Sequence, residues 1–292
     1  MRILNVKFAS LLIAGMGLAT TSFGQVGFSG TVNSGSVATA LGYRTEALGT
    51  YSSSFGDQTK ASGERSTVFG FRSTASGDQS FAAGHWSTAS GLYSFALGAR
   101  AVASNGHAMA FGIDVQATDN RSMIIGTGTG KTSPNPMVNG IPNSLMIGFN
   151  STVPTLFVGA SSGAGTTGKV GVGTTSTPSM IGSADLSEYS LYVAGGLLAE
   201  EVRVRTGWAD YVFYDNYQLK PLDEVADYIE ENGHLPNVPS AEQVEEEGIE
   251  LGDITRIQQE KIEELTLYLI ELKQEVEALK VQLTNQENNS LK

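Results

Sequence analysis

Glycine recurs at every seventh position in the first half of the chain, and this spacing constrains the fold more than any other feature. The slots hold Gly35, Gly42, Gly49, Gly56, Gly63, Gly70, Gly77, Gly84, Gly91, Gly98, Asn105 and Gly112. Glycine adopts a positive φ without steric cost, and asparagine is the next most tolerant residue. We therefore expect a tight turn at each slot and a short strand between successive turns.

A period of fourteen is superimposed on the period of seven. Residues two before each slot are small or β-branched: Ala40, Ala47, Ser54, Ala61, Val68, Ala75, Ala82, Ala89, Ala96, Ala103 and Ala110. Residues one before the slot are large and apolar only in alternate units, such as Phe55 and Phe69, and serine fills most of the units between them. The pattern predicts a structural repeat of fourteen residues, with two strands in each turn of a coil.

The alternation of side chains along a strand assigns the faces of this coil. The small row fills a thin interior, serine and threonine cover one outer face, and large apolar side chains form a stripe on the other. Nothing in the chain covers that stripe, and burial of each side chain contributes about 1.5–3 kcal/mol. We predict an obligate oligomer whose interface in this region comprises Phe55, Phe69, Phe81, Phe95, Leu97, Met109, Phe111, Met123 and Ile125.

The first 24 residues have the pattern of a secretory signal peptide. Arg2 and Lys7 precede an apolar stretch over residues 8–19, and small residues end at Gly24. The stretch is too short to span a bilayer as a helix, although a retained N-terminal membrane anchor is the alternative. We predict export to the cell surface or extracellular space, with no membrane-spanning segment once the signal is removed.

Charge and composition exclude several classes of protein. Residues 200–292 hold 22 acidic and 8 basic residues, whereas residues 1–199 hold 8 and 10. The sequence has no basic stripe with interleaved aromatic residues, so no nucleic-acid partner is expected. It also has no cysteine, which excludes disulfides and thiolate chemistry.

Two glycine-rich segments have sequences similar to those of nucleotide-binding loops. Residues 163–168 satisfy G-x-G-x-x-G, but a phosphate loop must lead into a helix, whereas residues 170–173 have the pattern of a strand. Residues 126–132 have the wrong spacing. The three histidines lack metal-ligand spacing, and no serine lies in a nucleophile motif. We expect no enzyme activity, no cofactor and no metal.

Beyond Gly126 the repeat is interrupted. Fragments of the unit return at residues 144–148 and 155–159, and strands are predicted at 191–193 and 202–204. The expected organisation is a signal peptide (1–24), a head of coiled repeats (25–126), interrupted repeats and loops (127–190), an α+β module (191–252), and a coiled-coil helix with a polar tail (253–292).

Helical signals begin at Pro221, which suits the first turn of a helix running to about residue 231. Gly233 suits the left-handed residue that ends this helix. Ser240 with Gln243 forms a capping box for a second helix that ends near Gly248.

A long third helix, capped by Asp253, carries a coiled-coil seam. The seam consists of Ile262, Leu265, Leu269, Leu272, Val276, Leu279 and Leu283. Branched residues alternating with leucine favour two strands, so three would need help from the rest of the chain. The alternative is an amphipathic helix that packs on its own domain.

Two segments resemble known families. The repeat, as in Ser80-Phe81-Ala82-Ala83-Gly84 and Ser94-Phe95-Ala96-Leu97-Gly98, resembles the YadA-like head repeat of trimeric autotransporter adhesins over residues 35–126. This resemblance implies a left-handed parallel β-roll, three chains packed side by side and a coiled-coil stalk. Residues 208–213, 234–240 and 261–268 are similar to modules that end secreted, tail-fibre-like bacterial proteins, which implies a trimer-forming or fibre-end cap.

The expected fold is mainly β, a β-roll followed by a small α+β region and a coiled-coil helix. The expected function is that of an exported homotrimeric adhesin-like fibre, whose polar outer face and turns contact an extracellular protein or glycan. The alternative is a purely structural fibre subunit whose C-terminal module is a trimerisation cap or an intramolecular assembly chaperone. The sequence leaves the choice between two and three chains open.

Overall fold

The computed structural model describes residues 29–130 and 135–290. These residues form two compact units, one reaching to Thr177 and including Tyr189–Gly196, the other formed by Pro178–Glu188 with the residues from Leu197 onward. The predicted signal peptide, residues 1–24, lies outside the described residues. No helix in the described part of the chain is long and apolar enough to cross a membrane.

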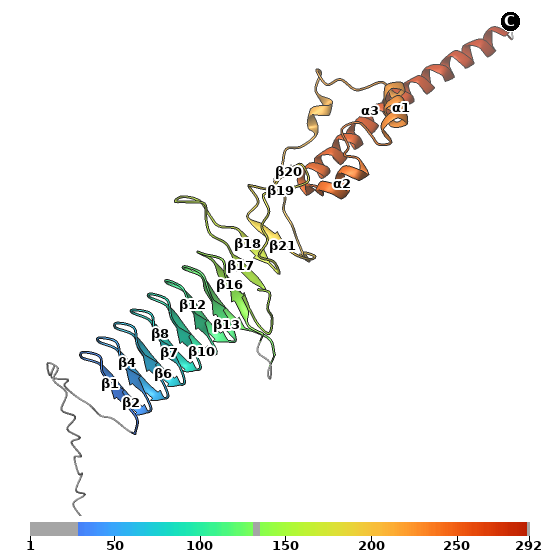
Figure 1. Cartoon of the computed structure of the whole chain (residues 1–292). Coiled ribbons are helices and arrows are strands. Elements are labelled where there is room, and N and C mark those ends of the chain that lie inside the picture. The colour runs from blue at the N-terminus through green and yellow to red at the C-terminus, as the bar shows by residue number, and fades with distance from the viewer. Residues whose placement is uncertain (1–28, 131–134, 291–292) are drawn as a thin grey trace, which may run out of the picture. The chain divides into compact units, whose positions relative to one another are not determined.

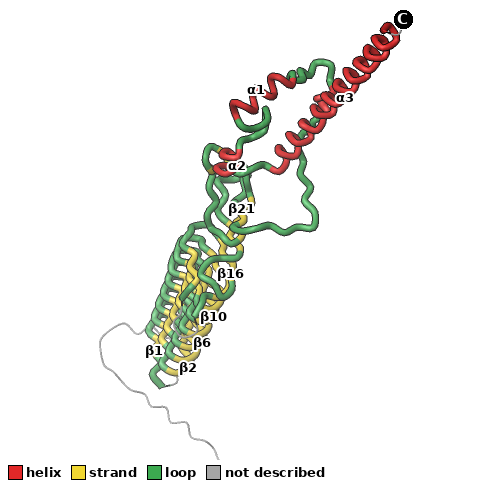
Figure 2. Tube along the Cα trace, turned by 90° about the vertical axis from the view of Figure 1, so that its right-hand side faces the viewer, coloured by secondary structure: helices red, strands yellow, loops and turns green. Residues whose placement is uncertain are grey.

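The first unit contains a parallel β-solenoid of about seven turns, seen as stacked strands in Figure 1 and as parallel yellow segments in Figure 2. The longer strands form one ladder: β2 (Thr39–Tyr43), β4 (Ser53–Asp57), β6 (Thr67–Phe71), β8 (Phe81–His85), β10 (Phe95–Ala99), β12 (Met109–Ile113) and β14 (Met123–Thr127). The shorter strands form the other: β1 (Val32–Asn33), β3 (Glu46–Ala47), β5 (Lys60–Ala61), β7 (Thr74–Ala75), β9 (Thr88–Ala89), β11 (Val102–Ala103), β13 (Val115–Ala117) and β15 (Met137–Asn139). Phe95 pairs with Met109, fourteen residues on, so the predicted mainly β coil with its fourteen-residue repeat is confirmed.

Four inward-pointing side chains in each turn fill the interior. The row two residues before the slots is buried, as predicted, and Ala82 and Ala89 have no exposed surface. A second buried row lies three residues after each slot, where Ser66 and Ser73 are also fully buried. The prediction that the serines of the repeats point outward is therefore wrong for this second row. It holds for Ser76, which directly precedes the slot at Gly77 and is exposed. Serine serves here as a small residue, because two sheets so close together leave no room for a larger one.

The glycine slots fall into two classes. Gly42, Gly56, Gly70, Gly84, Gly98 and Gly112 lie within the longer strands and have φ between +111° and +141°. Gly49, Gly63, Gly77 and Gly91 do not have a positive φ, so the prediction of a left-handed turn at every slot is wrong for them. Both classes need glycine because successive turns approach closely: a Cβ added at Gly77 would meet the backbone of Gly91 well inside the 3.0 Å that real Cβ atoms essentially never breach.

The left-handed turn residue lies two positions after each slot. These residues have φ between +50° and +59°, and they are Val37, Arg44, Tyr51, Gln58, Arg65, Arg72, Gln79, Trp86, Tyr93, Arg100, His107, Asp114 and Arg121. Each bears a conformational cost of about 1–2 kcal/mol, since none is glycine. The ladders on both sides of the turn impose this conformation.

Replacing Arg121, an exposed residue of this row with φ +53°, tests that cost. We expect Arg121→Gly to be more stable to unfolding than Arg121→Ala by about 1 kcal/mol, because only alanine keeps the left-handed strain. Thermal unfolding of both variants measures the difference. Equal stability, or a more stable alanine variant, would show that the turn is not strained.

The coil ends where its side chains become larger. β16 (Leu145–Gly148) pairs parallel with β14, confirming the predicted repeat fragment at residues 144–148. β17 (Leu156–Val158) instead pairs antiparallel with β16, so the prediction that residues 155–159 continue the same unit is wrong. β18 (Val170–Val172) and β21 (Leu191–Val193) extend this sheet. Phe157 is too large for the narrow interior of the repeats, and it is buried at their end.

The second unit contains a small hairpin of β19 (Met180–Ile181) and β20 (Ala184–Asp185), the 3₁₀ helix η1 (Asp210–Phe213), and three α-helices. The α-helices are α1 (Leu222–Asn232), α2 (Ala241–Glu247) and α3 (Leu251–Ser290). Gly233 ends α1 with φ +74°, and both hydrogen bonds of the capping box at Ser240 are present, as predicted. α3 begins before Asp253, which therefore lies in its first turn, and the strand predicted at residues 202–204 does not form.

Candidate functional site

The outer surface of the longer-strand ladder is an apolar face, formed by Phe55, Phe69, Phe81, Phe95, Leu97, Met109, Phe111, Met123 and Ile125. Its rings stack along the coil, with centroids 4.6 Å apart for Phe81 and Phe95 and 5.2 Å apart for Phe95 and Phe111. In the single chain Phe69 is 42% exposed and Leu97 is 43% exposed. The structure thus places all the predicted residues of this region on one continuous surface that the described residues leave half-buried or exposed.

The outer surface of the shorter-strand ladder is polar by contrast. Thr74 and Thr88 alternate there with serines such as Ser76. Near its start Lys60 and Glu46 form an ion pair with an Nζ–Oε2 distance of 3.1 Å. The coil is therefore amphipathic, and only one of its two broad faces has the composition of a contact surface.

Helix α3 carries the predicted seam on one stripe. Ile262, Leu265, Leu269, Leu272, Val276, Leu279 and Leu283 are between 40% and 58% exposed. They recur at alternating spacings of three and four residues, so they share one side of the helix. The seam is the second long apolar surface left uncovered in the single chain.

Residues outside the seam connect α3 to the rest of its unit. The Tyr211 hydroxyl donates a hydrogen bond to Glu260, and the Tyr217 hydroxyl donates one to Glu264. Tyr268 donates to the carbonyl oxygen of Lys220 at 2.6 Å. The seam residues Ile262 and Leu265 also line a cleft with α1, so the alternative in which the helix packs on its own domain stays open beside the coiled coil.

These contacts shift the tyrosine pKa values upward. Burial and then the hydrogen bond to Glu264 raise the pKa of Tyr217, and burial followed by the hydrogen bond to Glu260 raises the pKa of Tyr211. A raised pKa means that the folded state holds the proton more tightly than the unfolded chain. The resulting stabilisation is complete below the unfolded pKa of about 10 and is lost as the pH rises above it.

Alkaline unfolding should therefore depend on Tyr217. We expect the helical unit of the wild-type chain to lose stability above about pH 10 more steeply than Tyr217→Phe, which has no hydroxyl to ionise. Far-ultraviolet circular dichroism during denaturant unfolding at several pH values reports this unit. Identical pH slopes for the two proteins would contradict the assignment.

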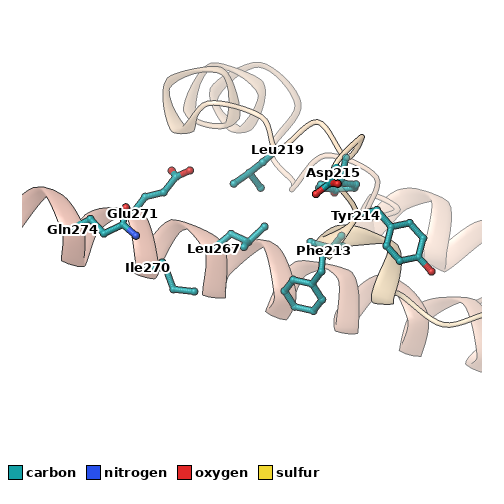
Figure 3. A pocket seen from close by; sticks show the side chains of 10 residues that line it. Phe213, Tyr214, Asp215, Leu219, Leu267, Ile270, Glu271 and Gln274 are labelled. Atoms are coloured by element: carbon teal, nitrogen blue, oxygen red, sulfur yellow. The ribbon is translucent and has the colours of Figure 1, made fainter.

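Three of the clefts in the described part of the chain border α3. One, of about 450 Å³, lies between residues 212–219 and the helix, and Figure 3 shows Leu219 facing Leu267 across it. A second, of about 560 Å³, lies between α1, the segment around Pro236 and α3, and includes Ile262 and Leu265 of the seam. A third, of about 380 Å³, lies between residues 219–222 and α3 and includes Leu272 of the seam. The cleft of about 560 Å³ is lined mainly by aliphatic and aromatic side chains, which suits packing against a chain better than acid–base chemistry.

The structure does not bring the glycine-rich loop and the three histidines together into one site. Residues 163–168 form an exposed loop that leads into β18 rather than into a helix, as expected for a segment that is not a phosphate loop. His85 and His107 lie in the solenoid and His234 follows α1. Within the described ranges no group of histidine, aspartate and glutamate side chains could hold a metal ion.

The turn residues are the surface that the sequence analysis failed to identify. The glycine pattern predicts the turns at the slots, whereas the left-handed turn residues lie two positions later. This row includes four arginines, two tyrosines and one tryptophan between positions 44 and 100. The signal was present in the sequence as a large or charged residue at every seventh position.

Comparison with known proteins identifies the repeats. The model of the YadA head domain repeat matches residues 34–59, 47–73, 61–85 and 75–101, so the predicted head repeats are confirmed over residues 34–101. No curated protein matches the chain. The similarity of the C-terminal part to fibre-end modules stays a prediction.

Proposed function

We propose that the chain is an exported homotrimeric adhesin-like protein of the cell surface, in which three copies bury the apolar face of the solenoid and the seam of α3 between them. The stack of the half-buried rings of Phe81, Phe95 and Phe111, beside the exposed Leu97, carries this proposal. The YadA head repeats support it, since that head is a component of adhesins. Burial of each large side chain adds about 1.5–3 kcal/mol to assembly.

Threefold assembly suits an adhesive role. A trimer presents every turn residue and every side chain of the polar face three times. Weak contacts to an extracellular protein or glycan then gain from avidity, which can exceed a single-site affinity by about 10²–10⁴.

A structural role is the second candidate. One observation favours it: residues 211–220 bind Glu260, Glu264 and Tyr268 of α3, while the seam residues stay 40–58% exposed and so available for other copies. In that case the C-terminal unit is a trimerisation cap or assembly chaperone, and the solenoid is a spacer without a ligand.

Two measurements on the full chain test these roles. Light scattering after size-exclusion chromatography should give three times the chain mass, and the immobilised protein should retain matrix proteins, glycans or cells. A trimer that retains none of them would favour the structural role. A well-folded single chain at micromolar concentration would contradict both.

A further inference from the structure

Four side chains from two neighbouring turns gather at one edge of the solenoid, where strands β6 and β8 end. The rings of Phe71 and His85 stack with centroids 5.1 Å apart, and His85 lies 4.8 Å from Trp86. Trp86 is 43% exposed although it occupies a left-handed turn position, with φ +58°. The left-handed conformation is common to the whole row of turn residues, so it is the exposed indole ring within a group of stacked side chains that points to a contact function at this edge.

Arg72 completes this group. Its guanidinium carbon lies 5.0 Å from the ring centre of Phe71 and 5.9 Å from that of Trp86. Its Nε donates a hydrogen bond of 3.2 Å to Gln58, whose amide nitrogen donates in turn to Asp57. The side chain is thus oriented by a neighbouring turn and by two aromatic rings.

Arg72 nevertheless has no acidic partner among the described residues. Arg65 pairs with Glu64, and Arg100 pairs with Asp114 through two hydrogen bonds. The terminal nitrogens of Arg72 make no hydrogen bond or ion pair within the part of the chain that the structure describes. They are available to an external anion next to an exposed indole ring.

We propose that Trp86, His85 and Arg72 form a binding site for a carboxylated sugar at the end of a glycan. The apolar C–H face of a pyranose packs on the electron-rich face of an indole ring. The planar guanidinium binds a carboxylate through two parallel hydrogen bonds, a geometry that lysine cannot provide. A neutral sugar would use only the ring, and a small anion only the arginine.

This inference names the ligand class of the proposed adhesive function and rests on it. The site lies within one chain, so each copy of a trimer would carry one. A single site is then expected to bind its sugar weakly, and the trimer is expected to bind a multivalent glycan surface tightly because of avidity. The nearby carboxylate of Asp57 accepts a hydrogen bond from Gln58 and forms no ion pair with Arg72 among the described residues.

Titration calorimetry of the full chain with 3′-sialyllactose, a hyaluronan tetrasaccharide and lactose tests the site. We expect one of the two acidic sugars to bind at least about tenfold more tightly than lactose. This is the gain in affinity expected from one pair of charge-assisted hydrogen bonds between the guanidinium and the carboxylate. The two acidic sugars distinguish a nonulosonic acid from a hexuronic acid. Arg72→Gln should abolish the preference over lactose, and Trp86→Asn, which tolerates the left-handed turn, should weaken binding of both sugars.

Arg121→Gln is the matched control, because Arg121 occupies an equivalent turn position without an aromatic neighbour among the ring contacts of the described residues. It should bind like the wild-type chain. Absence of binding by both acidic sugars to a trimeric wild-type chain would overturn the site while leaving the trimer intact. Loss of the trimer in Trp86→Asn would also overturn it, since the edge would then be a contact between copies.

Discussion

Gly98→Ala should unfold the centre of the solenoid, with a loss of more than about 4 kcal/mol in the free energy of unfolding. Gly98 has φ +141°, and a Cβ added there would collide with the backbone carbonyl of Gly112 on the next turn. Relief would require the two turns to separate, which breaks the ladder between β10 and β12. Amide hydrogen exchange across residues 81–113 measures the loss of protection directly.

Gly106→Ala is the matched control in the same array. Gly106 does not have a positive φ, and the nearest atom to its added Cβ is the side-chain Oδ1 of Asn120 at 3.2 Å, which can move. We expect its stability to stay within about 1 kcal/mol of the wild type. If the two substitutions lowered the free energy of unfolding equally, the close approach of the turns would not explain why glycine recurs at every seventh position.

The second large effect concerns assembly. Phe95→Asp should weaken trimer formation by about a thousandfold or more, because it places an unpaired carboxylate among stacked rings that the other copies are proposed to bury. Phe111→Asp should act in the same way, since its ring stacks on that of Phe95. Light scattering as a function of protein concentration measures the dissociation.

Ser76→Asp supplies the control for added charge. Ser76 is exposed on the polar face, beside β7, and the substitution should change stability by no more than about 0.5 kcal/mol and leave the trimer intact. Hydrogen exchange of Phe95→Asp separates dissociation of folded chains from unfolding. A trimer that survives both phenylalanine substitutions would place the contact between copies on another surface.

The repeat could be predicted because each turn constrains the next. Two backbones that stack every fourteen residues exclude a Cβ at Gly77 and Gly98 alike, and they leave space only for small side chains such as Ala82 between the sheets. Such steric requirements appear in the sequence as a period. The helix boundaries could be predicted for a similar reason, because Gly233 and Ser240 act on backbone groups within a few residues of themselves.

The turn edge could not be predicted in the same way. A positive φ was expected of glycine, but the ladders impose it on Trp86 and Arg72 at a cost that no local preference reveals. The gathering of Phe71, Arg72, His85 and Trp86 depends on the stacking of turns fourteen residues apart. Likewise, the sequence of residues 155–159 resembles a repeat, yet the strand runs antiparallel where Phe157 buries its ring.

The sequence by itself determined the coil, its period, its amphipathic character and the seam of α3, because all of these follow from residue size and polarity at fixed spacing. Only the tertiary structure decided which backbone positions carry the left-handed turns, which serines are buried, and which side of α3 binds residues 211–220. Those features arise from contacts between segments far apart in the chain. Their energies depend on the closed ladders and the packed helix, and no single stretch of residues encodes them.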